Sequence, residues 1–288
     1  MMESTITLGN GHNIWTNVVG GGPGLPLLLL HGGPGAGHDY LEPLAALGAE
    51  RPVVFYDQLG CGKSDIPENP ALWTIERFAD EIQEVRSKLG IERCHLLGQS
   101  WGGWLGIEYL LREPPGVASV VLASTSASIP EFSGECERLI GELSEAHRIA
   151  LRNYGERGEF EHPDYIAAVE VFYQQHVCRL SEWPDCLIRT VENLHHTPVY
   201  AAINGPNEFT TIGNLRYWDR TPELQKISIP VFITCGRYDE LGPRCAQTLQ
   251  VGIKGSLLRV FEESAHVAHI EETEKYLECI STFLKTHD

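Results

Sequence analysis

A serine between two glycines is the feature of this sequence that most directly suggests chemistry. The segment GQSWG at residues 98–102 follows a short apolar run at 95–97 and precedes a stretch with helical character. This is the G-x-S-x-G pattern, in which a sharp strand-to-helix turn holds a serine hydroxyl outward. Glycines two residues on either side of the serine permit such a turn without Cβ clashes. The alternative is a glycine-rich turn with an ordinary capping serine, and the partners described next favour a nucleophile, Ser100.

A serine hydroxyl becomes a good nucleophile when a base takes its proton and a carboxylate orients that base. In folds with this type of turn the chain order is serine, acid, histidine. Asp239 follows the apolar run at 231–234, and His266 follows the run at 257–261. We therefore expect Asp239 as the orienting acid and His266 as the base.

Other acids and another histidine compete for these roles. Asp57 precedes the serine in the chain, and Asp219 lies in a segment without predicted strands. His269 is the rival base, and if a helix begins after His266 it points a turn away. His266 and His269 also form a His-x-x-His pair, but no further ligand motif accompanies it, so we expect neither a metal nor a cofactor.

Two more glycine-containing segments follow predicted strands. HGGPG at 31–35 could turn backbone N–H groups toward the serine as one half of an oxyanion hole, with the N–H of Trp101 as the other half. A bare turn is the alternative.

The segment at 57–64 ends in Gly-Lys-Ser and resembles a phosphate-binding loop. Asp57 stands where that motif requires its first glycine, and Pro67 and Pro70 interrupt the helix that should follow, so we reject this interpretation.

The elements that must position these residues follow an alternating pattern. Short apolar runs without polar alternation are typical of strands buried on both faces of a parallel sheet, and they occur at 27–30, 53–56, 95–97, 119–122, 231–234 and 257–261. A 3.6-residue apolar period predicts a helix over 75–89, with Thr74 as its N-cap and Gly90 as its end. A hairpin is expected around 9–11 and a closing helix over 274–284. The fold class is therefore α/β, with a mostly parallel sheet and helices on both faces.

One long segment breaks this alternation. Residues 128–226 contain helix formers and aromatics but no run typical of a buried strand. We therefore predict a core made of residues 1–127 and 227–288, with 128–226 inserted as a helical cap. Such a cap would cover the carboxyl edge of the sheet, where open α/β sheets bind their ligands.

Composition excludes several classes of protein. The 288 residues carry a formal charge of −17, without a basic run, which makes nucleic acid an unsuitable partner. The eight cysteines form no C-x-x-C pair, and the longest aliphatic run near the start covers only residues 27–30, too short for a signal peptide or a membrane span. We expect a cytoplasmic protein that does not interact with membranes; the oligomeric state is left open.

Taken together, the motifs resemble those of the prolyl iminopeptidase family of α/β hydrolases. The matching segments are HGGPG (31–35), DQLGCGKSD (57–65), GQSWGG (98–103), NGPNEF (204–209), GRYDE (236–240) and ESAHVAHIEE (263–272). The resemblance implies the α/β-hydrolase fold and a serine aminopeptidase that prefers N-terminal proline. It places the triad on Ser100, Asp239 and His266.

The same resemblance assigns roles around the triad. It implies that Gly33 and Trp101 donate to the oxyanion and that Glu208 and Glu240 hold the substrate's free α-amino group. Solvated surface glutamates are the alternative for these two acids. The substrate would be a small peptide or an aminoacyl amide, and the inserted segment would form an apolar pocket that includes Trp183 and Phe209.

One position departs from the family pattern, because Leu59 stands where family loops often have arginine. Relatives with similar motifs cleave amino-acid amides or other acyl substrates, so the resemblance supports a hydrolase more firmly than a preference for proline. Two alternatives therefore remain. One is an amidase or esterase acting on a small biosynthetic acyl substrate, and the other is a non-catalytic binding protein on a hydrolase fold.

Overall fold

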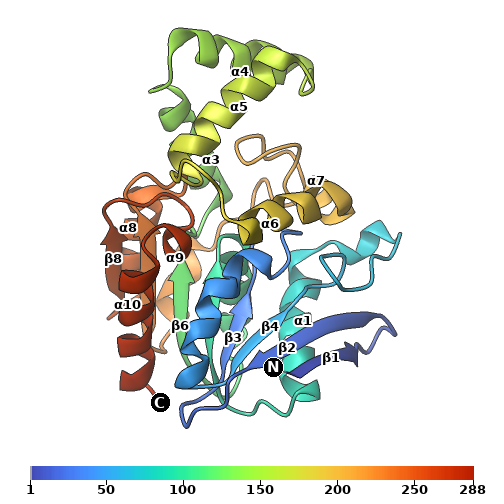
Figure 1. The fold of residues 1–288 in the computed structure, drawn as a ribbon, viewed down its shortest axis with the longest axis vertical. Helices are drawn as coiled ribbons and strands as arrows, with labels where there is room; N and C mark the ends of the chain where they lie inside the picture. Colours follow the sequence, from blue (N-terminus) through green and yellow to red (C-terminus); the bar gives the residue numbers. More distant parts are fainter. Residues whose placement is uncertain (1) are drawn as a thin grey trace.

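The computed structural model describes residues 2–288, and Figure 1 shows the arrangement of its elements. In chain order these are β1 (Met2–Thr7), β2 (Asn13–Val19), β3 (Leu27–Leu30), η1 (Asp39–Ala49), β4 (Val53–Tyr56), η2 (Pro70–Leu72), α1 (Ile75–Lys88), β5 (Cys94–Gln99), α2 (Trp101–Leu110), β6 (Val117–Ala123), α3 (Ile129–Ile140), α4 (Glu145–Arg157), α5 (Pro163–His176), α6 (Asp185–His196), α7 (Pro198–Ile203), η3 (Thr221–Lys226), β7 (Val231–Gly236), α8 (Gly242–Gly252), β8 (Leu257–Phe261), α9 (Ala268–Glu271) and α10 (Thr273–Thr286).

The strands of this part of the chain form one sheet with the order β1-β2-β4-β3-β5-β6-β7-β8. The β1–β2 and β2–β4 pairs are antiparallel, and every later pair is parallel. The predicted α/β class with a mostly parallel sheet is confirmed. Because the parallel strands run the same way, the loops after β3, β5, β7 and β8 emerge at one edge of the sheet.

The inner strands β3 and β4 are buried at every residue, which explains why they are apolar without alternation. In β3, Leu28 and Leu30 pack into the core beneath α1 and α2, whereas Leu27 and Leu29 pack into a second core beneath η1 and α10. The apolar run of β3 thus supplies two hydrophobic layers at once.

The predicted helix at 75–89 is present as α1. The Thr74 hydroxyl accepts the N–H of Arg77 as an N-cap, and Gly90 follows the helix with a φ of +68°. The buried face of α1 carries the residues of the predicted apolar period, including Phe78 and Ile82. The predicted N-terminal hairpin and closing helix correspond to β1–β2 and α10.

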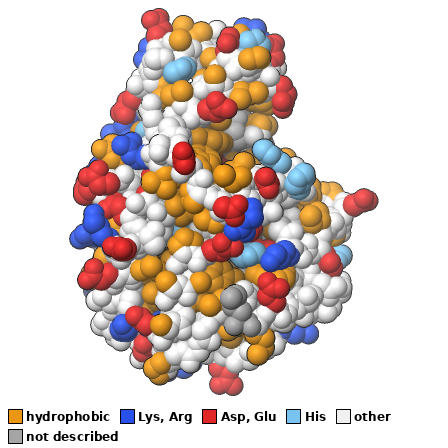
Figure 2. All heavy atoms as spheres, in the orientation of Figure 1, with side chains coloured by type: hydrophobic (Ala, Val, Ile, Leu, Met, Phe, Trp, Pro, Cys, Tyr) orange, Lys and Arg blue, Asp and Glu red, His pale blue; other side chains and the backbone are white. Residues whose placement is uncertain are grey.

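Between β6 and β7 the chain forms α3 to α7 and η3, with no strand of the sheet in the described residues. In Figure 1 helices α3 to α7 lie beyond the carboxyl edge of the sheet, and α4 and α5 form a lobe at the far end of the molecule. Figure 2 shows a waist between this lobe and the body that contains the sheet, with hydrophobic side chains gathered along it. None of the described helices combines the length and the apolar character that crossing a bilayer requires.

Candidate active site

The turn between β5 and α2 holds Ser100 in an unusual backbone conformation. Its φ of 57° and ψ of −123° lie in a region that costs a non-glycine residue about 1–3 kcal/mol. The Ser100 N–H donates to the carbonyl of Ala123 in β6 at 2.9 Å, which fixes the turn against the sheet. A Cβ at Gly98 would lie 2.2 Å from the Gly102 carbonyl oxygen, and one at Gly102 would lie 1.9 Å from that of Leu30. Both glycines of the motif are therefore required by close backbone approach.

An oriented imidazole lies at the same edge of the sheet. His266, in the loop between β8 and α9, donates from Nδ1 to Oδ1 of Asp239 at 2.8 Å, and both side chains are buried. Burial opposes protonation of the imidazole, but the charge and hydrogen bond of Asp239, with the charges of Glu240 and Glu208, raise the pKa of His266 to about 9. Because Nδ1 faces the aspartate, Nε2 is the nitrogen left for a reacting group.

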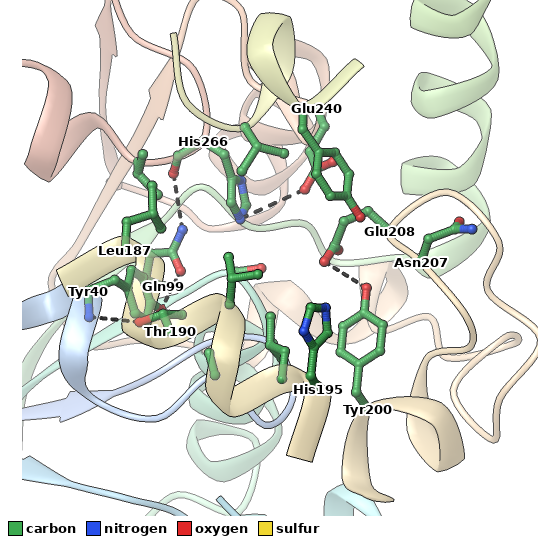
Figure 3. Close-up of a pocket in the computed structure, with 18 of the residues that line it drawn as sticks. Tyr40, Gln99, Leu187, Thr190, His195, Tyr200, Asn207, Glu208, Glu240 and His266 are labelled. Atoms are coloured by element: carbon green, nitrogen blue, oxygen red, sulfur yellow. Dashed lines mark hydrogen bonds and ion pairs between the residues drawn. The ribbon is translucent and has the colours of Figure 1, made fainter. Parts of the chain in front are cut away.

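Ser100 and His266 border the same cavity, which has a volume of about 440 Å³. Among the described residues the Ser100 hydroxyl has no hydrogen-bond partner, so it is free to meet a substrate. Figure 3 shows His266 at one end of this cavity, directed toward Glu240. Ser100 and His266 thus face one cavity from loops that are 166 residues apart in the chain.

Two backbone N–H groups near Ser100, those of Gly33 and Trp101, are without acceptors in the described chain. Gly33 borders the cavity with a φ of +106°, and a Cβ there would lie 2.6 Å from the N of Gly35. Trp101 is the first residue of α2, so its N–H has no partner within the helix. Within residues 2–288 neither N–H has an acceptor. Free donors near a nucleophile are what an oxyanion hole requires.

The cavity also contains a pair of acids. Glu240 is buried, its Oε1 lies 3.9 Å from His266 Nε2, and its Oε2 has no hydrogen-bond partner in the described chain. Oε1 of Glu208 accepts the hydroxyl of Tyr200 at 2.7 Å. Burial raises the pKa of Glu208 despite this bond, and burial followed by the charge of Glu208 raises the pKa of Glu240 well above its usual range. A bound cation would relieve this repulsion, so the pair suits a positively charged group.

The rest of the cavity wall is mainly apolar, and much of it comes from α6. Its lining residues recur at the spacing of one helix face: Leu187, Thr190, Val191 and Leu194. This i, i+3, i+4, i+7 spacing is the signal in the sequence that could have identified them. No comparable signal marks Tyr200 or Tyr173, which reach the cavity from α7 and α5.

The two aromatic residues expected in the pocket are placed differently. Trp183 borders the cavity, and its Nε1 donates to the carbonyl of Cys178 at 3.3 Å. Phe209 lies outside the cavity lining: its ring packs edge-on against Phe172 with 5.1 Å between centroids. The turn at 204–209 directs Glu208 inward, which leaves the next side chain to pack among the helices of the insertion.

The rival acids and base have other partners. Asp57 is bonded to His38 and to the Lys63 N–H, and Asp219 accepts the N–H of Thr221 at the start of η3. His269 is turned away from Ser100, and its Nε2 donates to the carbonyl of Tyr40 at 3.0 Å. Burial lowers the pKa of His269 to about 4, which keeps the ring neutral.

One group of possible metal ligands occurs in the described chain, formed by His38, Asp39 and Glu42. The Arg189 guanidinium pairs with both acids, and His38 Nδ1 donates to Asp57. These atoms therefore already have partners inside the protein, and the group lies outside the cavity lining. Through Arg189 this group of residues links α6 to η1, and it is not a candidate metal centre.

The end of α5 is bonded directly to the loops after β7 and β8. The Glu240 N–H donates to the carbonyl of His176 at 3.2 Å, and the His266 N–H donates to that of Val177 at 3.0 Å. His176 Nδ1 in turn donates to the carbonyl of Tyr238 at 2.8 Å. The helical segment is thus joined to the loops that carry Asp239 and His266.

Comparisons with known proteins agree with this geometry. Residues 26–273 match the family model described as alpha/beta hydrolase fold. A proline iminopeptidase of Saccharolobus solfataricus is 43% identical over 90% of this chain and 84% of its own length. One from Heyndrickxia coagulans is 38% identical over 92% of each chain. The crystal structure of a proline iminopeptidase from Mycobacterium smegmatis superposes with a TM-score of 0.93 at 36% identity, covering 99% of this chain and 98% of its own.

Proposed function

The chain belongs to the proline iminopeptidase family of α/β hydrolases, and we infer from this membership that it is a serine aminopeptidase. Its substrates are small peptides or aminoacyl amides with a free N-terminus, preferably proline. The observation that carries this assignment is the pair Glu208 and Glu240 in the cavity bordered by Ser100 and His266. An exopeptidase must recognise an ammonium group beside the bond it cleaves, and two carboxylates supply that recognition.

The strength of this recognition follows from the charges. At about 4 Å, with an effective dielectric constant near 20, each ammonium–carboxylate contact contributes about 4 kcal/mol before desolvation. A substrate with a blocked amine loses this attraction and leaves two carboxyl groups buried without a counter-charge. The acid pair therefore favours free amino termini over acylated ones.

The proposed reaction passes through an acyl-enzyme. The Ser100 Oγ attacks the carbonyl carbon of the N-terminal residue while His266 Nε2 takes the hydroxyl proton, a contact that closes when substrate is bound. The N–H groups of Gly33 and Trp101 hold the oxyanion. The C–N bond then breaks as His266 gives its proton to the leaving amine. Water, deprotonated by His266, attacks the ester, and the Ser100 Oγ recovers the proton as the free amino acid leaves.

Asp239 fixes the imidazole tautomer through its 2.8 Å bond to Nδ1 and stabilises the imidazolium that forms. We assign residues 128–226 as a helical cap on a core of 1–127 and 227–288. The cap supplies Glu208 and the apolar wall of α6, including Leu187 and Leu194. A cavity of about 440 Å³ has room for a proline residue together with part of its leaving group.

The direct test compares chromogenic anilides of proline, alanine and leucine with their N-acetylated forms. We expect free proline anilide to be cleaved fastest and N-acetylation to lower kcat/KM by at least about 100-fold, equivalent to about 2.7 kcal/mol. Equal rates on free and acetylated substrates would eliminate the aminopeptidase assignment and leave a hydrolase of other amides or esters.

A further inference from the structure

Two buried polar side chains border the catalytic groups but have no part in the reaction described above. Tyr40 is the second residue of η1, and Gln99 is the last residue of β5, next to Ser100. Only 3% of Tyr40 and 2% of Gln99 is exposed. Burying three polar atoms in this way destabilises the fold unless each has a partner, so the identity of those partners is informative.

Hydrogen bonds connect these atoms in one continuous chain. The Gly32 N–H donates to the Tyr40 hydroxyl oxygen at 2.7 Å, and that hydroxyl donates to Gln99 Oε1 at 2.6 Å. Gln99 Nε2 then donates to the backbone carbonyl of His266 at 3.1 Å, a bond drawn in Figure 3. We name this set of three bonds the Tyr40–Gln99 bridge. It joins the loop of the oxyanion donor, the strand that carries the nucleophile, and the loop of the base.

The backbone around Gly32 leaves room for this bridge and little else. A Cβ at Gly32 would lie 2.9 Å from Gln99 Oε1, 2.9 Å from the Tyr40 hydroxyl oxygen and 3.0 Å from the Cβ of Ser100. The bridge therefore lies directly behind the nucleophile, and a side chain at position 32 would displace it.

Tyr40 is itself held on both sides. Its N–H donates to the Thr190 hydroxyl of α6 at 3.0 Å, and its carbonyl accepts from His269 Nε2 at 3.0 Å. Its ring also packs edge-on against that of His269, with 5.4 Å between centroids. Burial raises the pKa of the Tyr40 phenol far above its usual range, so the hydroxyl stays protonated and continues to donate.

We propose that Tyr40 and Gln99 are positioning residues that set the distances between the oxyanion donor Gly33, the nucleophile and the base. The proposal rests on the function assigned above. The three groups lie in loops from β3, β5 and β8, and small displacements between them reduce the rate of the chemical step far more than they reduce binding. All three polar atoms of the bridge are bonded to protein, so the two side chains act through their neighbours.

The test is a kinetic comparison of Tyr40→Phe, Gln99→Met and the double variant on proline anilide. We expect each single variant to lower kcat by about 10- to 100-fold while KM stays within about twofold, since the acid pair is untouched. Affinity for a proline boronic acid, which forms a tetrahedral adduct with the serine, should fall in parallel with kcat. The kcat of the double variant should be at most about twofold lower than that of the less active single variant, because each substitution breaks the same bridge.

Tyr276→Phe is the matched control. Tyr276 is also buried and also borders His269, but its hydroxyl pairs with Thr234 at 3.4 Å and not with a catalytic loop. We expect its kcat to stay within about twofold of the parent enzyme. Thermal melting of each variant establishes that the fold is retained, and if Tyr40→Phe does not fold, Gln99→Met carries the same expectation.

Several results would overturn the proposal. One is a kcat within twofold of the parent in both single variants, and another is a rise in KM at constant kcat. A third is a double variant whose fold loss in kcat equals the product of the fold losses of the two single variants. Ser100→Ala, measured alongside, separates this proposal from the proposed function: if it abolishes activity while the bridge variants do not, only the bridge is disproved.

Discussion

The carboxyl edge of the sheet and the helical segment 128–226 hold their functional side chains by different means. At the sheet edge main-chain hydrogen bonds hold the backbone of the loops: the Ser100 N–H bonds to Ala123, and the Tyr238 N–H, next to Asp239, bonds to Ser264. In the helical segment a side chain holds the functional group, because the Tyr200 hydroxyl donates to Glu208. Main-chain bonds fix the course of the loops after β5 and β7, and we propose that the Tyr40–Gln99 bridge sets the distances between the groups on them. Glu208 depends on one side-chain contact, so a single substitution can move it.

This difference matches the division of labour that we propose. The sheet edge carries bond-breaking groups, whose placement must be accurate. The helical segment carries Glu208 and the apolar face of α6, which select the substrate. Substitutions at the sheet edge should therefore lower kcat, and those in the helical segment should act mainly on KM and selectivity. The following predictions test this contrast.

The largest effect is expected at the nucleophile. Ser100→Ala should lower kcat by roughly 10⁴-fold or more while substrate binding persists, because the acid pair remains intact. Turnover of proline anilide and labelling by a serine-directed fluorophosphonate measure this. Ser281→Ala, on α10 and bonded to Glu50, is the control and should behave like the parent enzyme. Residual activity above about one tenth would show that another group attacks the carbonyl.

On the side of the helical segment, Glu208→Gln should raise KM for free proline anilide by about 10- to 100-fold and change kcat much less. The substitution removes one of two ammonium partners but keeps an acceptor for the Tyr200 hydroxyl. The acetylated substrate should be almost unaffected. Glu192→Gln, an exposed position on α6, is the matched control. If kcat fell while KM stayed constant, the proposed division between the two regions would be wrong.

Glu240 lies where the two regions meet, and pH dependence probes it. The imidazole must be neutral to act as a base, and in the free enzyme its pKa is raised to about 9, so kcat/KM should increase with pH up to that value. A bound ammonium adds positive charge and lowers this pKa, so the acid limb of kcat should lie at lower pH than that of kcat/KM. Glu240→Gln removes a negative charge and should move the acid limb of kcat/KM to lower pH. Identical limbs in parent and variant would contradict this account.

The smallest effect is expected where α6 attaches to the body. Arg189 pairs with Asp39, Glu42 and Asp185, but its side chain is 36% exposed. Arg189→Ala should lower the free energy of unfolding by about 0.2–1 kcal/mol, because water screens such pairs. A change in KM of two- to threefold and an unchanged kcat are expected, measured by urea unfolding and steady-state kinetics. A tenfold loss of kcat would mean that this attachment also positions the catalytic groups.

Much of the fold could be predicted because its signals are local. The strands at 27–30, 53–56 and 257–261 match β3, β4 and β8, since an apolar run between turns needs no distant information. The bounds of other strands were less accurate: β5 extends to Gln99 and β7 to Gly236. These additional residues are Gly98 and Gln99 in β5 and Cys235 and Gly236 in β7, and they pair because the neighbouring strand continues beside them.

Part of the site could be predicted because its signals are also local. Ser100 stands directly after β5, and Asp239 and His266 lie a few residues beyond β7 and β8, so the parallel sheet brings their loops to one edge. The Tyr40–Gln99 bridge could not be predicted, because its partners are 59 and 167 residues apart. Gln99 lies within the GQSWG segment, but nothing in the sequence indicates that Tyr40 is its partner. Phe209 was expected in the cavity wall from its residue type, but the direction of its side chain depends on the turn after α7, which the sequence pattern does not reveal.

The adjacency of Asp239 and Glu240 has an evolutionary consequence. One peptide bond joins Asp239, which we propose orients the catalytic histidine, to Glu240, which we propose selects the substrate. Any mutation that reshapes the loop after β7 should therefore alter both properties. Glu208 carries no such linkage, since it lies in a separate segment. Divergence toward new substrates should therefore begin at position 208 and its neighbours, while the acidic dipeptide changes last.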